Sequence, residues 1–174
     1  IEAAAARGLS KFIGRGREME TLNESFEKTQ SGSGQVIGVV GEAGVGKSRL
    51  LLEMRNMLPE GDYTYLQGRC LHYGGSMAYL PILDILRSYF DIKEGDSESN
   101  IKEKIKENIL RFDERLKTVL PPFQEILSLT VDDGAYLQLE PAVKKIRTFE
   151  AIRDLLVRLS ETHPLVLAVE DLHW

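Results

Sequence analysis

The feature that most constrains this chain is the run Gly41-Glu42-Ala43-Gly44-Val45-Gly46-Lys47-Ser48. It follows the pattern G-x-x-x-x-G-K-[S/T] of a phosphate-binding loop. An apolar, largely β-branched run over residues 35–40 precedes it, and helix-forming residues fill positions 47–58. A strand, a glycine loop and a helix in this order are the context in which the pattern binds phosphate.

Each position of this loop has a physical reason. We expect its three glycines to adopt positive φ and to let the backbone approach an anion closely. Successive backbone N–H groups then form an anion-binding nest, and the helix that follows adds its positive end. Lys47 is expected to reach the β- and γ-phosphates, and Ser48 to offer its hydroxyl to Mg²⁺. The alternative is a glycine turn before an ordinary helix.

Composition excludes several other classes of protein. The chain has 174 residues, 43% of them hydrophobic, and a net charge of −5, which fits one globular domain without a nucleic-acid-binding surface. No apolar run reaches the roughly 18 residues of a membrane-spanning helix, and the first residues do not form a signal peptide. The single cysteine, Cys70, cannot form an internal disulfide, which favours the cytoplasm.

Hydrophobic periodicity predicts helices alternating with strands, and therefore an α/β fold with a mostly parallel sheet. Proline pair 121–122 is expected to interrupt a helix, residues 91–100 to form a mobile loop, and residues 68–79 and 130–138 to be irregular. The expected helices cover 17–29, 47–58, 81–90, 101–112, 114–120, 123–129 and 143–161, and the expected strands cover 35–40, 63–67 and 165–171.

A second site is indicated near the end of the chain, where five apolar residues at 165–169 precede Glu170 and Asp171. Such a run predicts a strand buried on both faces, as in a parallel sheet. Carboxylates at its end match the Walker B pattern, and opposite Ser48 they would hold Mg²⁺ or orient the attacking water. The alternative is an acidic pair that ends a strand before a turn.

At these residues the sequence resembles the ATPase modules of the AAA-type/STAND class. The closest likeness is to modules of large bacterial regulators and to those C-terminal to class III adenylyl cyclase domains. Residues 2–9 also resemble the linker that follows such a cyclase domain. The resemblance spans essentially the whole chain and is carried by Phe12-Ile13-Gly14-Arg15, residues 41–50, Gly68-Arg69-Cys70 and residues 164–174.

The resemblance implies a P-loop NTPase fold, a three-layer α/β/α architecture with strand order 5-1-4-3-2. The sequence begins at Ile1 and stops at Trp174 directly after an apolar run, so we interpret it as an excised piece. Residues 1–11 would be a linker from an upstream domain, and 12–174 the N-terminal part of the ATPase domain. The sheet would then be incomplete, since the strand between the first and the Walker B strand is missing.

The resemblance also assigns roles to residues. Lys47, Glu170 and Asp171 would be catalytic, with Glu170 on the metal side and Asp171 orienting water, although many relatives carry Asp first. Ser48, Glu170 and Asp171 would hold the metal. The residues placed at the nucleotide are Ile13, Gly14 and Arg15 near the adenine, and Gly41, Glu42, Ala43, Gly44, Val45, Gly46, Lys47, Ser48 and Arg49 around the phosphates.

Other candidate residues have simpler interpretations. Cys70, His72 and His163 do not have the spacing of a zinc site. His173 and Trp174 would either shape the site or pack beside it, and Arg49 also fits a solvated helix position. The charged residues between Lys102 and Lys117 are expected to face solvent or a partner domain. The sequence has no N-K-x-D motif for guanine, so ATP is favoured over GTP.

The sequence therefore predicts an ATP- and Mg²⁺-binding regulatory ATPase domain of a multidomain signalling protein. The expected partners are ATP or ADP, an upstream domain such as an adenylyl cyclase and downstream regulatory domains, with a homo-oligomer left open and no membrane contact. An arginine finger, worth about 10³–10⁵ in rate, is expected outside this piece, so hydrolysis by the piece alone should be very slow. The alternatives are a non-hydrolysing nucleotide-binding or oligomerisation module and, less favoured, a kinase.

Overall fold

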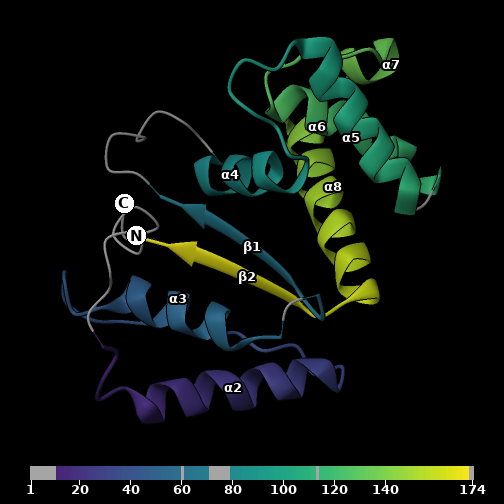
Figure 1. Ribbon diagram of the computed structural model, residues 1–174. Helices are drawn as coiled ribbons and strands as arrows, with labels where there is room; N and C mark the ends of the chain where they lie inside the picture. Colours follow the sequence, from purple (N-terminus) through teal and green to yellow (C-terminus); the bar gives the residue numbers. More distant parts are fainter. Residues whose placement is uncertain (1–10, 60, 71–78, 113, 173–174) are drawn as a thin grey trace. The chain divides into compact units, whose positions relative to one another are not determined.

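A computed structural model describes residues 11–59, 61–70, 79–112 and 114–172 (Figure 1). The chain divides into two compact units, residues 1–63 and 64–174, and each is described here by itself. Sequence-based expectations for residues 1–10 and for His72, Gly74, Gly75, His173 and Trp174 lie outside the described residues.

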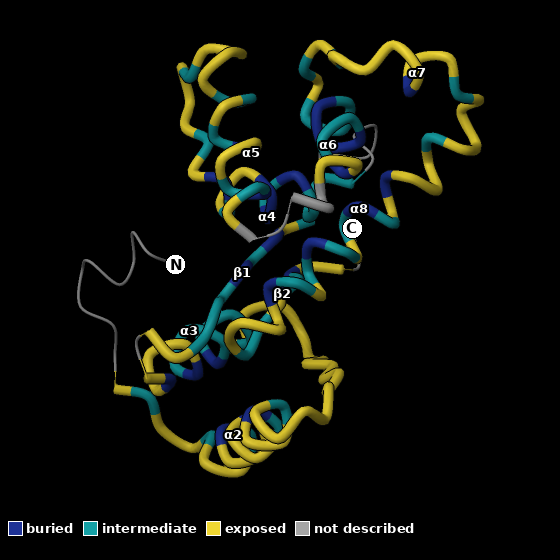
Figure 2. Tube along the Cα trace, turned by 90° about the vertical axis from the view of Figure 1, so that its right-hand side faces the viewer, coloured by how far each residue is buried: buried dark blue, intermediate teal, exposed yellow. Residues whose placement is uncertain are grey.

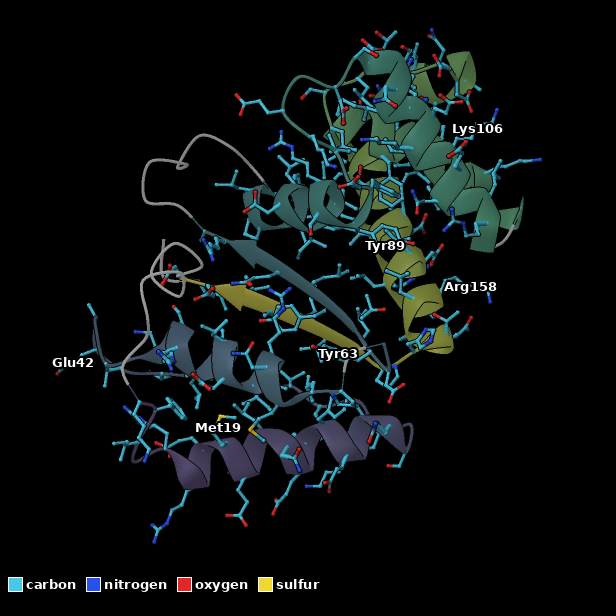
Figure 3. All side chains as sticks on the ribbon, viewed as in Figure 1. Met19, Glu42, Tyr63, Tyr89, Lys106 and Arg158 are labelled. Atoms are coloured by element: carbon cyan, nitrogen blue, oxygen red, sulfur yellow. The ribbon has the colours of Figure 1, made fainter. Side chains whose placement is uncertain are left out.

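The first unit is built on two helices, α2 (Gly16–Gln30) and α3 (Lys47–Met57). The expected buried face of α2 is confirmed, because Met19, Leu22 and Phe26 are buried at helical spacing. Figure 3 shows Met19 between α2 and α3. Leu50 and Met54 supply the buried face of α3. These contacts fix the helix that begins directly after the glycine loop.

The expected strand over residues 35–40 is wrong, since no strand is assigned to this segment. Its side chains are uncovered, with Val36 103% and Val40 96% exposed. A strand needs a neighbour to accept and donate its backbone hydrogen bonds, and the described part of the first unit contains no second strand. An apolar, β-branched sequence alone is therefore not enough to form a strand here, because no neighbouring strand among the described residues pairs with it.

The second unit contains two parallel strands, β1 (Thr64–Arg69) and β2 (Leu165–Glu170). Their register runs from Thr64 opposite Leu165 to Arg69 opposite Glu170. Both strands were expected, and β1 extends two residues beyond its predicted end because β2 pairs with it along its whole length. In the expected strand order 5-1-4-3-2, β1 and β2 would correspond to strands 2 and 3, which are neighbours.

Helices fill the chain between the two strands. They include α4 (Leu80–Tyr89), which packs along β1, and the long α8 (Pro141–Thr162), which confirms the predicted amphipathic helix (Figure 1). Between them lie α5 (Glu98–Phe112), the 3₁₀-helix η2 (Glu114–Val119), α6 (Leu120–Ile126) and α7 (Gly134–Leu137).

Several of these elements differ from the prediction. Helix α5 begins at Glu98, inside the loop expected over residues 91–100, and the helix expected over 114–120 is the 3₁₀-helix η2. Pro121 and Pro122 do not interrupt a helix but lie at the start of α6, where a missing backbone N–H costs no hydrogen bond. The segment expected to be irregular contains α7, because the Asp133 carboxylate caps it. Its Oδ1 accepts from the backbone N–H of Ala135 at 2.9 Å and of Tyr136 at 3.0 Å.

The core of the second unit joins the sheet to these helices. Leu66 of β1 packs with Phe90, Phe123 and residues of α8 such as Leu155. The Phe90 and Phe123 rings meet edge to face with centroids 5.8 Å apart. Figure 2 shows buried stretches along α4, α6 and α8.

The expectation that β2 is buried on both faces is wrong. Ala168 and Glu170 are buried at 7% and 8% exposure, whereas Leu167 on the opposite face is 41% exposed. A strand is buried on both faces only when layers cover both sides of its sheet. In the residues that the structure describes, burial follows one face of β2. No helix among them is long and apolar enough to cross a bilayer.

Candidate functional site

The glycine loop takes its shape from two different properties of glycine. Gly44 and Gly46 have φ of 79° and 95°, in the left-handed region that side chains disfavour. Gly46 is the N-cap of α3. Gly41 does not have the expected positive φ; a Cβ there would lie 2.9 Å from Val45 Cγ1. A side chain at Gly41 would therefore need the partly exposed Val45 side chain to shift, so close approach within the loop favours glycine there.

Lys47 folds back over this loop. Its Nζ donates hydrogen bonds to the carbonyl oxygens of Gly41 at 2.9 Å and Glu42 at 3.0 Å. Lys47 and Ser48 are the first two residues of α3, where backbone N–H groups have no acceptors within the helix. The ammonium group and the positive end of the helix thus face the same loop. This arrangement fits a phosphate group.

The segment before α2, predicted to lie near the adenine, contacts the loop and α3. The Arg15 Nη2 atom donates to the carbonyl oxygen of Val45 at 3.1 Å. The Arg49 guanidinium lies 5.9 Å from the centre of the Phe12 ring, a cation–π distance. Ile13, which lies between Phe12 and Arg15 in the sequence, is 75% exposed. The structure therefore brings this segment to the phosphate loop, although the two lie about thirty residues apart in the sequence.

A cavity of about 280 Å³ lies within the first unit, next to the loop. This volume is close to the lower end of the range for ligand pockets, roughly 300–1,000 Å³. Its walls combine charged groups with apolar side chains, as a site for a nucleotide requires. They are formed by Arg15, Glu18, Thr21, Leu22, Ile37, Gly38, Val39, Val40, Val45, Gly46, Lys47 and Leu50.

The second predicted site lies at the end of β2. Glu170 is buried, and the Gln67 side-chain amide donates a hydrogen bond to its Oε1. The Arg69 Nε atom lies 3.6 Å from the same oxygen. Both partners come from β1 and share one face of it, because they are two residues apart. Sequence reasoning missed Gln67; the available signal was a polar residue inside a predicted strand.

Asp171 has a different environment from Glu170. It is exposed, and its φ of 60° places its backbone in the left-handed region. Asp tolerates this conformation better than most residues with a side chain. The adjacent carboxylates therefore diverge: Glu170 is held against β1, and Asp171 is open to solvent. That divergence is compatible with two different roles.

The predicted site residues are divided between the two units. Ser48 lies in the first unit and both carboxylates lie in the second, so their common metal site stays a prediction. Within the described residues, no three His, Cys, Asp or Glu side chains gather in a way that could hold a metal ion.

Comparison with known proteins identifies the family. A sequence model described as the AAA ATPase domain matches residues 11–174. The chain belongs to this family. Membership in the AAA ATPase domain family means a P-loop α/β fold and a nucleotide-binding domain, in agreement with the phosphate loop.

The AAA ATPase domain also resembles part of a much longer protein. It is 28% identical over 168 residues to an uncharacterized protein of Rhizobium meliloti (strain 1021). The alignment covers 94% of this chain and 16% of that protein. No solved structure matches the chain.

Proposed function

We propose that this AAA ATPase domain binds ATP with Mg²⁺ and acts as a regulatory ATPase within a multidomain signalling protein. The observation that carries the proposal is Lys47, whose ammonium lies over a glycine loop at the start of α3. The matched relative supports the multidomain context, since the aligned region is only 16% of its length. The signalling role is suggested by the resemblance of this sequence to STAND-class modules that are attached to adenylyl cyclase domains.

The residues of the loop would bind the nucleotide as follows. Lys47 exchanges the carbonyl oxygens of Gly41 and Glu42 for the β- and γ-phosphate oxygens, and the backbone N–H groups of the loop donate to the same phosphates. Ile13 and Gly14 lie near the adenine. Both Arg49 and Arg15 keep their contacts beside the loop.

Hydrolysis would use the two carboxylates at the end of β2. Mg²⁺, when bound by Ser48 and Glu170, supplies positive charge to the phosphate oxygens. Asp171 orients a water molecule, whose oxygen attacks the γ-phosphorus in line as the bond to the β–γ bridging oxygen breaks. Exchange between the ATP and ADP states would then change the arrangement of attached domains. The expected partners are an upstream domain joined through residues 1–11 and downstream domains. A second copy of the chain is a further candidate partner.

Substitution of the loop lysine tests ATP binding. Lys47→Ala should weaken the affinity of the full-length protein for ATP at least about tenfold, which corresponds to about 1.4 kcal/mol. Lys28→Ala, which removes an exposed lysine from the last turn of α2, should leave the affinity unchanged. Isothermal titration calorimetry measures both. Equal affinity of Lys47→Ala and wild type would contradict the central proposal.

A non-hydrolysing nucleotide-binding module is the second candidate. It is favoured by the environment of Glu170, whose carboxylate is already engaged by Gln67 and Arg69. Single-turnover release of γ-phosphate by the full-length protein separates the two candidates. Hydrolysis predicts slower release by Asp171→Asn, whereas ATP binding without phosphate release by wild type supports the second candidate.

A further inference from the structure

The Arg15 side chain makes two hydrogen bonds, one within the start of α2 and one to the phosphate loop. Its Nη1 atom donates to Glu18 Oε1 at 2.7 Å, and its Nη2 atom donates to the Val45 carbonyl oxygen at 3.1 Å. Arg15 is the N-cap residue of α2, and Glu18 lies in the first turn of the same helix. One guanidinium group thus connects the start of α2 to the middle of the loop.

We infer that Arg15 is a positioning residue for the phosphate loop and that it acts with Glu18 through the Val45 carbonyl group. This inference rests on the proposed nucleotide-binding function. It differs from the role that the resemblance implied, in which Arg15 lies near the adenine. The residue would govern affinity for the phosphates rather than for the base.

The position of Val45 explains why a single hydrogen bond matters there. Val45 lies between Gly44 and Gly46, which are both in the left-handed region and have no side chains to restrict them. The Val45 carbonyl and the Gly46 N–H belong to one planar trans peptide group, so they point in opposite directions. Fixing the carbonyl on Arg15 therefore directs the Gly46 N–H to the opposite side. Orientation of such N–H groups is what makes a loop bind anions.

The chemistry requires arginine rather than another cation. A guanidinium group has a rigid, planar set of donors, so one nitrogen can bind a carboxylate while another binds a carbonyl. Lysine has a single nitrogen on a flexible stem and does not hold both acceptors in fixed geometry. Hydrogen bonding from Arg15 lowers the pKa of the Glu18 carboxyl, because the guanidinium stabilises its ionised form.

A second contact anchors the same segment. The Phe12 ring lies against the Arg49 guanidinium, three residues before Arg15. Residues 12–15 are therefore attached at one end to α3 and at the other to the loop that begins α3. Displacement of this segment would disturb the loop at Val45.

Binding of ATP and of base-free tripolyphosphate to the full-length protein tests the inference. Arg15→Ala should weaken both ligands by the same factor, about fivefold to tenfold, the loss expected for one such hydrogen bond. Arg15→Lys should restore little of this loss. Arg17→Ala is the matched control, because Arg17 is exposed on the same helix, and it should leave both affinities unchanged.

Amide hydrogen exchange without nucleotide provides a second readout. Arg15→Ala and Glu18→Gln should both accelerate exchange in the peptide that contains residues 43–47, and Arg17→Ala should not. Loss of ATP affinity with unchanged tripolyphosphate affinity would overturn the inference, because Arg15 would then act on the base. Unchanged exchange in Arg15→Ala would overturn it as well. If wild type binds neither ligand, the proposed function fails, whereas the exchange measurement still decides the role of Arg15.

Discussion

The side-chain amide of Gln67 in β1 donates a hydrogen bond to the carboxylate of Glu170 in β2. The two residues are 103 positions apart in the sequence, and the parallel register places Gln67 opposite Ala168, two residues before Glu170. Glu170 is 8% exposed, so its carboxylate depends on protein groups for most of its hydrogen bonding. The last residue of the strand is thus oriented by its neighbour in the sheet.

Replacement of Gln67 should therefore destabilise the second unit. Gln67→Leu leaves a buried carboxylate without its amide donor and should lower the free energy of unfolding by about 1–3 kcal/mol. Urea unfolding followed by circular dichroism measures the change. Arg69→Ala is the control on the same strand: this side chain is 47% exposed and 3.6 Å from the carboxylate, so we expect about 0.5 kcal/mol or less.

A double-mutant cycle tests whether that cost comes from the pair. In a Glu170→Leu background, Gln67→Leu should change the free energy of unfolding little, because no buried carboxylate remains. An equal cost in both backgrounds would mean that Gln67 stabilises the sheet by another route.

Gly68 should be intolerant of even a methyl group. A Cβ at this position would lie 2.2 Å from the Pro81 carbonyl oxygen and 2.8 Å from the Pro81 carbonyl carbon. These are backbone atoms at the start of α4, so relief requires α4 to move away from β1. We expect Gly68→Ala to lower the free energy of unfolding by about 1–3 kcal/mol, as overpacking does in cores. Gly134→Ala, where a Cβ has open space, should be neutral or slightly stabilising and serves as the control.

Two tyrosines should make the stability of the second unit fall at high pH. Burial raises the pKa of Tyr89 to about 12, and burial with a hydrogen bond to Glu125 raises the pKa of Tyr136 to about 12. In the unfolded chain both ionise near 10, so the folded state binds these protons more tightly. Their contribution is complete below a pH of about 10 and is lost as the pH rises towards 12. Urea midpoints measured across this range should fall steadily.

Substitution by phenylalanine should distinguish these two tyrosines. The Tyr136 hydroxyl donates to Glu125 Oε2 at 2.7 Å, so Tyr136→Phe should cost about 1 kcal/mol at neutral pH. Among the described residues the buried Tyr89 hydroxyl has no hydrogen-bond partner, and Tyr89→Phe should be neutral or stabilising. Both variants should show a smaller alkaline loss than wild type. Equal costs at neutral pH would contradict the assignment of these partners.

Local patterns in the sequence predicted the elements that depend on local interactions. The apolar spacing in α2 and α8 located both helices, and the glycine pattern located the start of α3 at Lys47. Features set by distant residues were missed. The Arg15–Val45 contact spans 30 positions, and no sequence period encodes it. Gln67 could be seen as polar but not as the partner of Glu170.

The expected helix interruption at the proline pair is wrong for a different reason. The sequence predicts an interruption at Pro121 and Pro122 because proline breaks the interior of a helix. At the first turn the same residues favour a helix, and which case applies depends on where η2 ends and α6 begins. That boundary is set by the packing of Phe123 and Val119 into the core, which the sequence does not specify locally.

The apolar segment at residues 35–40 leads to the last prediction. Val36 and Val40 are 103% and 96% exposed, and natural proteins rarely leave such a run without a partner. If the remaining strands of a three-layer P-loop sheet lie outside this sequence, they would pair with this segment in the full-length protein.

Val36→Thr and Val40→Thr keep the side-chain shape but add a hydroxyl. In the 174-residue chain each should change the free energy of unfolding by about 0.5 kcal/mol or less, because the side chains are already in water. In the full-length protein each should cost about 1–3 kcal/mol, since burial of an unpaired hydroxyl is unfavourable. Equal small changes at both lengths would mean that this segment is not a buried strand, and that the sheet next to the phosphate loop is built from other residues.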